Sequence, residues 1–257
     1  MTKRLGLFGM AAALALGLGV RPAAAAPIFG PEIYVKVQPA GTPDVYSDSI
    51  TVPTAGVYLV VIQNGDDGGG RITSGSVVVN TTTVVNDVQL GGPREFFARN
   101  VALKAGTQPL TVTLNDPDPG AFLSVVVLPV AERWDFTVGR LLLPYADSTD
   151  TTLVLRSGAS LYNRRLRISY FDSAGTMQAT SDRLTLAPQA NLSGSAASFI
   201  TTGSWTSGSI AVFWAGQGPA RVFGTATTVD PTSSQKGLVE MEHAGYRSRD
   251  FFKAAKE

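Results

Sequence analysis

The feature that most constrains the fold is a series of short, β-branched runs between Ser74 and Pro129. Each run is four to eight residues long and is soon followed by Gly, Pro, Asn or Asp. Runs that recur about every 8–12 residues, with turn residues between them, are typical of an antiparallel all-β sandwich. The five runs are Ser76–Val79, Thr82–Val85, Phe96–Leu103, Leu110–Leu114 and Phe122–Leu128.

The strand predicted at Val57–Gln63 is the most apolar of the chain, and it is hydrophobic on both faces. Val125–Leu128 has the same character. We expect the opposite sheet to cover one face of such a strand, and a loop, a second domain or a partner to cover the other. With further strands at Ile33–Val37 and Asp44–Val52, the first domain has about eight strands and closes near Pro129.

A second set of β-runs follows the polar link Ala131–Arg133 and predicts a second sandwich. Apolar and polar side chains alternate cleanly along Arg164–Phe171. Asp172–Gly175 is predicted to be a hairpin turn, in which Gly175 supplies a positive φ. The predicted strands are Trp134–Leu143, Thr151–Leu155, Arg164–Phe171, Met177–Leu186, Ser195–Thr201, Ser209–Ala215 and Ala220–Thr227.

The predicted fold class is therefore all-β, with two tandem antiparallel β-sandwich domains of the Ig-like or jelly-roll-like kind. The first domain occupies residues 26–131 and the second residues 132–230. A polar tail, residues 231–257, has room for a short strand at Gly237–Met241 and for a short helix capped by Ser248. Phe251 and Phe252 in this tail either dock on the protein's own surface or bind a protein partner.

Residues 1–25 have the pattern of a secretory signal peptide. Lys3 and Arg4 give a positive start, and Leu5–Val20 is an apolar core of 16 residues, which is short for a membrane span of about 20. Ala23–Ala26 supplies small residues, so cleavage is expected after Ala25 or Ala26; an uncleaved anchor is the alternative. The expected location is secreted, periplasmic or on the bacterial cell surface, with no stable membrane insertion after cleavage.

Charge and cysteine content narrow the function classes. Of the 21 basic residues, Lys3, Arg4 and Arg21 leave with the signal, so 18 face 20 acidic residues and the net charge is −2. This balance gives no reason to expect a nucleic-acid partner, which usually needs a concentrated positive face. The chain has no Cys, so its stability must come from burial and strand pairing and not from disulfides.

Catalytic motifs do not rise above background. The single histidine, His243, lies in the polar tail, and no serine lies in a Gly-x-Ser-x-Gly elbow, which argues against a Ser–His hydrolase. No cofactor and no Cys/His metal site are expected. Paired carboxylates for glycoside hydrolysis stay open, and calcium is the alternative for Asp66–Asp67 or for Asp116 and Asp118. Turn aspartates of this kind more commonly bond to the backbone.

Two groups of residues are candidates for binding. Arg164, Arg165 and Arg167, with Tyr162, form a basic cluster. Arg165 and Arg167 share a face of one strand, which either grips an anion or is a solvated sheet face. Trp205 lies in a predicted loop, where it either stacks on a sugar ring or anchors the loop to the core. Trp214 is expected to pack inward because its neighbours are apolar.

Two stretches resemble β-sandwich accessory modules of secreted bacterial proteins. The first resemblance lies in Gly75–Asn80, Val101–Gly106, Leu110–Leu114 and Pro119–Val125; the second lies in Leu143–Ala146, Arg167–Gly175 and Gly208–Val212. The resemblance implies an extracellular location and a modular architecture, and it supplies no catalytic residues.

The function expected from the sequence is that of a non-enzymatic exported protein with a structural, adhesive or assembly role. A protein partner or self-association is expected. The alternative is a carbohydrate- or ligand-binding module that acts through Trp205, and a carboxylate-type hydrolase is the third hypothesis.

Overall fold

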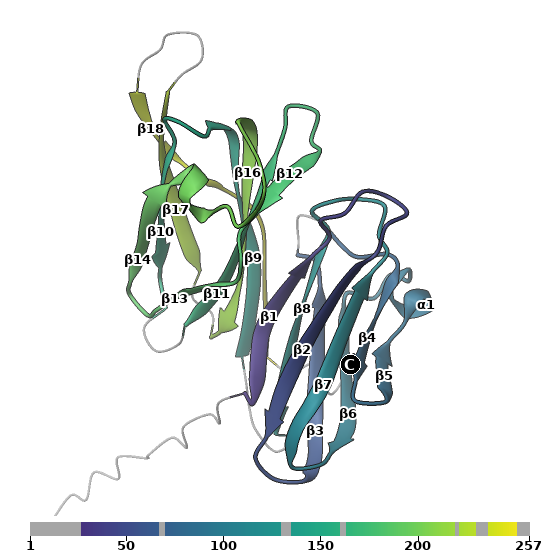
Figure 1. Ribbon diagram of the computed structural model, residues 1–257. Coiled ribbons are helices and arrows are strands. Elements are labelled where there is room, and N and C mark those ends of the chain that lie inside the picture. Colours follow the sequence, from purple (N-terminus) through teal and green to yellow (C-terminus); the bar gives the residue numbers. More distant parts are fainter. Residues whose placement is uncertain are drawn as a thin grey trace, which may run out of the picture.

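The computed structural model describes residues 27–66, 70–129, 135–159, 163–218, 221–229 and 236–250, without the side chains of residues 135, 136 and 244–250. It confirms an all-β protein, in which the described residues form several antiparallel sheets and one short α-helix (Figure 1). Within these ranges, no helix has the length and apolar character needed to cross a membrane. The signal-like segment, Trp134, Tyr162, Phe251 and Phe252 lie outside the described residues.

The first half of the chain forms two four-stranded sheets, with strand orders β1-β8-β3-β6 and β2-β7-β4-β5. Their inner faces enclose one hydrophobic cluster, which contains Tyr34, Ile50, Val60 and Val112 among others. The predicted strands of this half are confirmed, with shifted ends. They are β1 (Phe29–Val35), β2 (Asp44–Val52), β3 (Gly56–Asn64), β4 (Gly75–Val79), β5 (Thr82–Val85), β6 (Phe96–Leu103), β7 (Gly106–Leu114) and β8 (Phe122–Pro129).

The second half forms two further sheets around a second hydrophobic cluster, which includes Leu153, Tyr170 and Trp214. One sheet has the order β15-β12-β11-β16-β9-β19, with β13 also paired to β11, and the other has the order β14-β10-β17-β18. The strands are β9 (Asp135–Asp147), β10 (Thr152–Ser157), β11 (Arg164–Phe171), β12 (Met177–Thr180), β13 (Leu184–Leu186), β14 (Asn191–Ser195), β15 (Thr202–Gly203), β16 (Ser207–Gln217), β17 (Val222–Val229), β18 (Lys236–Glu240) and β19 (Glu242–Asp250).

Three predicted elements are wrong. The single strand expected at Met177–Leu186 is interrupted at Ser181–Arg183, because Ser181 bonds back to Ile168 while β12 and β13 each pair with β11. A 3₁₀ turn replaces part of the strand expected at Ser195–Thr201. Ser248 lies in β19, which pairs with β9, so it caps no helix.

Two local features complete the fold. The prediction missed helix α1 (Asp87–Leu90), which begins with a reciprocal capping box between Asn86 and Gln89. The hairpin turn at Asp172–Gly175 is confirmed: Gly175 has a φ of +80°, and Asp172 accepts hydrogen bonds from the backbone of Ala174 and Thr176.

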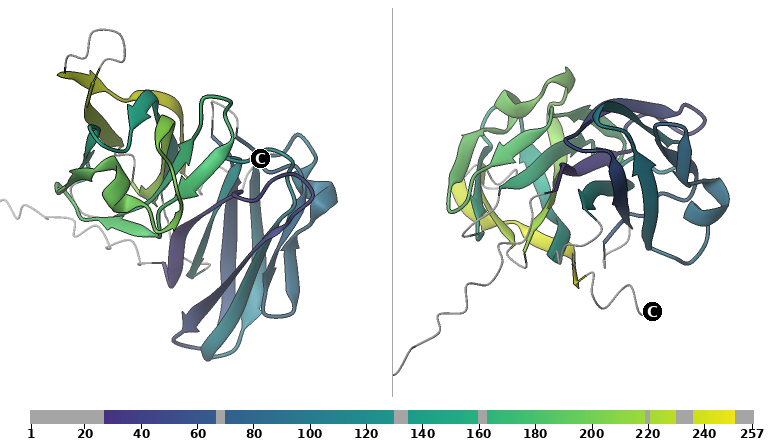
Figure 2. Two further views of the ribbon diagram at one scale, coloured as in Figure 1. Left: turned by 45° about the horizontal axis from the view of Figure 1, so that its top comes forward. Right: turned by 90° about the horizontal axis from the view of Figure 1, so that it is seen from below.

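The two apolar faces of β3 and β8 are both buried, as predicted. One face of each strand lies in the cluster of the first half, through Val60 and Val127. Val61 and Val126 on the other face lie in a third hydrophobic cluster, which also contains Phe213 of β16. The second half of this chain therefore covers the outer face. Figures 1 and 2 show β1, in purple, at the boundary with the green strands, and β1 contacts β11 and β16.

Replacing Val61 by Ala is expected to lower the free energy of unfolding by about 1–3 kcal/mol, because it opens a cavity in the third cluster. Val57 lies on the same face of β3 but is 53% exposed, so Val57→Ala is the matched control and is expected to stay within about 0.5 kcal/mol of wild type. Urea unfolding measures both values. Equal effects of the two substitutions would contradict burial of this face by the second half.

Candidate functional site

The candidate site lies where β1 and β2 of the first half meet β11 and the β12–β13 connection of the second. Tyr46 and Asp48 alternate with exposed residues along β2, so their side chains point toward the junction. Buried Lys36 fixes the start of β2, since its ammonium group donates to the carbonyl of Thr42 and to the carboxylate of Asp44, both at 2.8 Å. The interruption between β12 and β13 supplies Arg183 from the other side.

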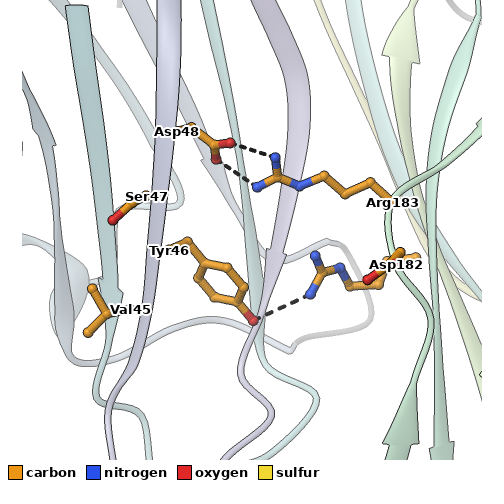
Figure 3. Close-up of a pocket in the computed structure, with 7 residues that line it drawn as sticks. Val45, Tyr46, Ser47, Asp48, Asp182 and Arg183 are labelled. Carbon is orange, nitrogen blue, oxygen red and sulfur yellow. Dashed lines mark hydrogen bonds and ion pairs between the residues drawn. The ribbon is translucent and has the colours of Figure 1, made fainter. Parts of the chain in front are cut away.

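Arg183 binds two carboxylates of the first half. Its Nη1 lies 2.6 Å from Oδ1 of Asp48 and its Nη2 lies 2.6 Å from Oδ2, which is the two-pronged arrangement in which guanidinium–carboxylate pairs are strongest (Figure 3). Its Nε lies 3.0 Å from Oε1 of Glu32. One side chain from the second half therefore joins β1 to β2.

Two tyrosines support these charges. The hydroxyl of Tyr34 donates to Oδ2 of Asp48 at 2.7 Å, and the guanidinium of Arg183 lies 5.4 Å from the centre of the Tyr34 ring. Tyr46 meets Tyr34 edge-on at 5.3 Å and donates its hydroxyl to the carbonyl of Val35 at 2.6 Å. Arg167 lies 5.4 Å from the centre of the Tyr46 ring, and its Nη1 donates to the Tyr46 hydroxyl at 3.4 Å.

The two carboxylates have pKa values shifted in opposite directions. Burial alone would raise the pKa of Asp48, but hydrogen bonds from Arg183 and Tyr34 and the charge of Arg183 lower it below its ordinary value. Burial raises the pKa of Glu32, and the charge of Arg183 offsets only part of that rise. Burial also raises the pKa of Tyr46 to about 12, so this hydroxyl stays protonated.

A cleft of about 440 Å³ opens beside this cluster. Its walls are residues 45–48 of β2, Arg167 of β11, and the Asp182–Arg183 pair of the β12–β13 connection (Figure 3). The cleft therefore draws its walls from both halves of the chain.

A second cleft, of about 410 Å³, lies elsewhere along the junction and is lined by Arg140, Phe171 and Phe213 among others. Asp66, which follows β3, lies 3.6 Å from Nε of Arg140 in β9. The rings of Phe122 and Phe213 meet nearby at 4.9 Å. Ion pairs and apolar contacts thus join the halves at more than one place.

The structure separates the predicted binding residues. Arg167 is 8% exposed and stacks on Tyr46, so the solvated outer face expected for it is wrong. Arg165 is half-buried and donates to the hydroxyl of Thr185 at 2.5 Å, outside the cleft. Tyr162, expected beside them, belongs to the undescribed residues, as do Phe251 and Phe252.

Trp205 is buried, with 5% of its surface exposed. Its ring packs against Tyr170 at 5.1 Å, and its indole N–H donates to the carbonyl of Phe171 at 3.1 Å. The indole face is therefore part of the core, which corrects the hypothesis that it stacks on a sugar ring. Trp214 is fully buried, as predicted.

The turn aspartates bond to the protein itself. Asp116 accepts hydrogen bonds from the backbone and hydroxyl of Thr73 and from the backbone of Asp118. Asp147 accepts from Thr149 and Asp150. Within the described part of the chain, His, Asp and Glu side chains form no group of three that could hold a metal ion. Asp67, part of one calcium candidate, lies outside the described residues, so that alternative is untested.

Sequence reasoning missed Glu32, Asp48 and Arg183. Arg183 was hidden in a strand predicted to be continuous. The available signal was in β2, where Tyr46 and Asp48 share the face of the buried Ile50 and Val52. Two polar side chains at core-facing positions of an amphipathic strand indicate a buried polar contact.

Comparisons with known proteins identify no family. No family model and no curated protein matches the chain. Among solved structures, an anti-sigma factor domain-containing protein aligns at a TM-score of 0.27 and 7% identity, over 77% of this chain and 82% of that chain. The exo-chitosanase CsxA of Amycolatopsis orientalis aligns at 0.28 and 12% identity, over 81% of this chain and 25% of the chitosanase. These scores indicate neither a shared fold nor a shared function, so the resemblance to secreted β-sandwich modules stays a prediction.

Replacing Asp48 by Asn is expected to lower the free energy of unfolding by about 1–2 kcal/mol at pH 7, because Arg183 loses its two-pronged partner in a partly solvent-exposed site. The folded-state pKa of Asp48 is lowered, so its ionised form contributes fully above about pH 4, and this contribution is lost as the pH falls through the folded-state pKa. The difference between variant and wild type should therefore shrink below about pH 4.

Urea unfolding at pH 7 and at about pH 3 measures this dependence. Asp182→Asn is the matched control, because Asp182 lines the same cleft but is exposed. It should change stability by less than about 0.5 kcal/mol at pH 7. A cost of Asp48→Asn that is the same at both pH values would contradict the role assigned to its charge.

Proposed function

We propose that this chain is an exported, non-enzymatic protein of the bacterial cell surface or periplasm, with a structural, adhesive or assembly role. In this proposal the two pairs of sheets are two tandem β-sandwich domains of Ig-like or jelly-roll-like kind, held as one rigid unit. The signal-like pattern of residues 1–25 supports export.

The main support for a structural role is that charged side chains form ion pairs between the two halves. Arg183 binds both Glu32 and Asp48, so these ion pairs fix β1 and β2 against the second half. Domains joined by a small polar interface move relative to each other by default. An interface that combines an apolar cluster with an ion-pair network instead suits a component that holds its outer surfaces at a fixed separation.

The carbohydrate-binding alternative loses its main support, because it depended on an exposed Trp205. The outer faces of β3 and β8 are covered by the second half and no longer argue for a partner there. Association with a partner or with further copies of the chain remains part of the proposal and must use other surfaces.

Export is tested by expressing the full chain in a bacterium and measuring the mass of the product in each cell fraction. We expect a product outside the cytoplasm that begins after Ala25 or Ala26. A chain of full mass that stays in the cytoplasm would contradict the proposal.

Assembly is tested by light scattering and electron microscopy of the exported protein. Defined oligomers or filaments are expected, and Asp48→Asn, which weakens the junction, should reduce them if assembly needs the fixed geometry. Asp182→Asn again serves as the control. A monomer under all conditions would count against self-assembly and would leave a partner protein as the object of the search.

A further inference from the structure

Arg167 is a buried, charged side chain of the junction that lies outside the ion-pair network of Glu32, Asp48 and Arg183. It is 8% exposed, and among the described residues no carboxylate oxygen lies within 4.0 Å of its guanidinium. Its Nε is buried without a hydrogen-bond partner, and its bond to the Tyr46 hydroxyl is long, at 3.4 Å. Burying a guanidinium without a counter-charge is costly, so this arrangement calls for an explanation.

The neighbouring acids do not supply that counter-charge. Asp48 is near enough for the charge of Arg167 to lower its pKa, but both its oxygens are engaged by Arg183, and one also accepts from Tyr34. Asp182 is exposed and makes no ion pair with Arg167. Each guanidinium nitrogen of Arg183 contacts a carboxylate oxygen, whereas the Nε of Arg167 has no hydrogen-bond partner.

Arg167 also lines the 440 Å³ cleft, which lies within the range of small-ligand sites. The ring of Tyr46 lies against its guanidinium, while Val45 and Ser47, which also line the cleft, are exposed to solvent. A ligand that enters from solvent therefore meets an oriented donor group with an aromatic ring beside it.

We propose that this cleft binds a carboxylate, held by the guanidinium of Arg167 beside the ring of Tyr46. A planar carboxylate matches the paired donors of a guanidinium and carries one negative charge. Phosphate and sulfate carry more charge and would be repelled more strongly by Asp48 and Asp182 in the same walls. The site adds a ligand function to the structural role and does not depend on it.

The carboxylate has two sources that share this chemistry: a free organic acid, or the C-terminal end of a peptide. The second source has a structural argument of its own. Among the described strands, β2 pairs only with β7, so we infer that an extended peptide pairs with its other edge and brings its terminal carboxylate to Arg167.

The test is a titration of the isotope-labelled full chain, followed by amide NMR shifts at constant ionic strength. The probes are acetate, benzoate, a four-residue alanine peptide with a free C-terminus, the same peptide amidated, phosphate and sulfate. We expect the carboxylates to shift signals of residues 45–48, 167 and 182–183 with saturation, and phosphate and sulfate to bind more weakly. If the free peptide binds more tightly than acetate and amidation abolishes this binding, the ligand is a peptide C-terminus. If the free peptide and acetate bind equally, the ligand is a small organic acid.

Arg167→Met keeps the apolar stem on Tyr46 and removes the charge, and it should weaken carboxylate binding at least about tenfold. Arg167→Lys keeps the charge but not the paired donors, so its carboxylate affinity should lie between those of wild type and Arg167→Met. Arg165→Met removes a positive charge from the same face of β11, outside the cleft, and should bind as wild type does.

The unmodified chain gives the decisive result even if an Arg167 variant fails to fold. Absence of saturable shifts at these residues with every carboxylate would overturn the proposal. So would phosphate binding tighter than carboxylate binding, unchanged binding by folded Arg167→Met, or an equal loss in Arg165→Met.

Discussion

Two central strands of the first half, β3 and β8, are apolar on both faces, and neither face can be left in water without a large free-energy cost. The opposite sheet covers one face. The other is covered by strands β9 and β16, which contribute Val138 and Phe213 to the shared cluster. The first half therefore needs the second half in contact with it. The positions of the clefts and of the charged groups at the junction follow from that contact.

Apolar contact alone does not fix how two sheets are oriented, because hydrophobic attraction is non-directional. The cluster of Glu32, Asp48 and Arg183 supplies direction, since a guanidinium fork accepts a carboxylate in few geometries. Ion pairs that solvent partly reaches, as it reaches Arg183, contribute little net stability, and we assign these pairs the role of selecting one arrangement. In this molecule they select the position of the β12–β13 connection against β2.

Arg167 and Arg183 both lie at the junction but have different surroundings, which the sequence around them does not show. Each guanidinium nitrogen of Arg183 contacts a carboxylate oxygen of Asp48 or Glu32, so this side chain serves the structure. Arg167 lies on an aromatic ring, lines the same cleft and has a buried Nε without a hydrogen-bond partner. The two arginines differ in their neighbours: Arg183 contacts two carboxylates, whereas Arg167 contacts an aromatic ring. Arg167 is therefore the arginine that we propose binds a ligand.

Local patterns in the sequence determined the strands and many of the turns. The two-faced character of Val57–Gln63 and the positive φ at Gly175 depend on near neighbours along the chain, and both agree with the structure. Along Arg164–Phe171 the apolar side chains of one face are buried as predicted, but Arg167 and Ser169 on the opposite face are buried as well. The strand predicted at Gly237–Met241 is present as β18. The break at Ser181–Arg183 and the strand β19, where a helix was predicted, depend on pairing with β11 and β9, which no local pattern reveals.

Only the tertiary structure decided which surface covers β3 and β8, and which charges meet. Asp48 and Arg183 are 135 residues apart in sequence, and Arg167 and Tyr46 are 121 apart. The sequence shows that these side chains are charged or aromatic, but not that they are neighbours. Their burial and shifted pKa values arise when the two halves close on each other, because both depend on distances of a few ångströms between distant parts of the chain.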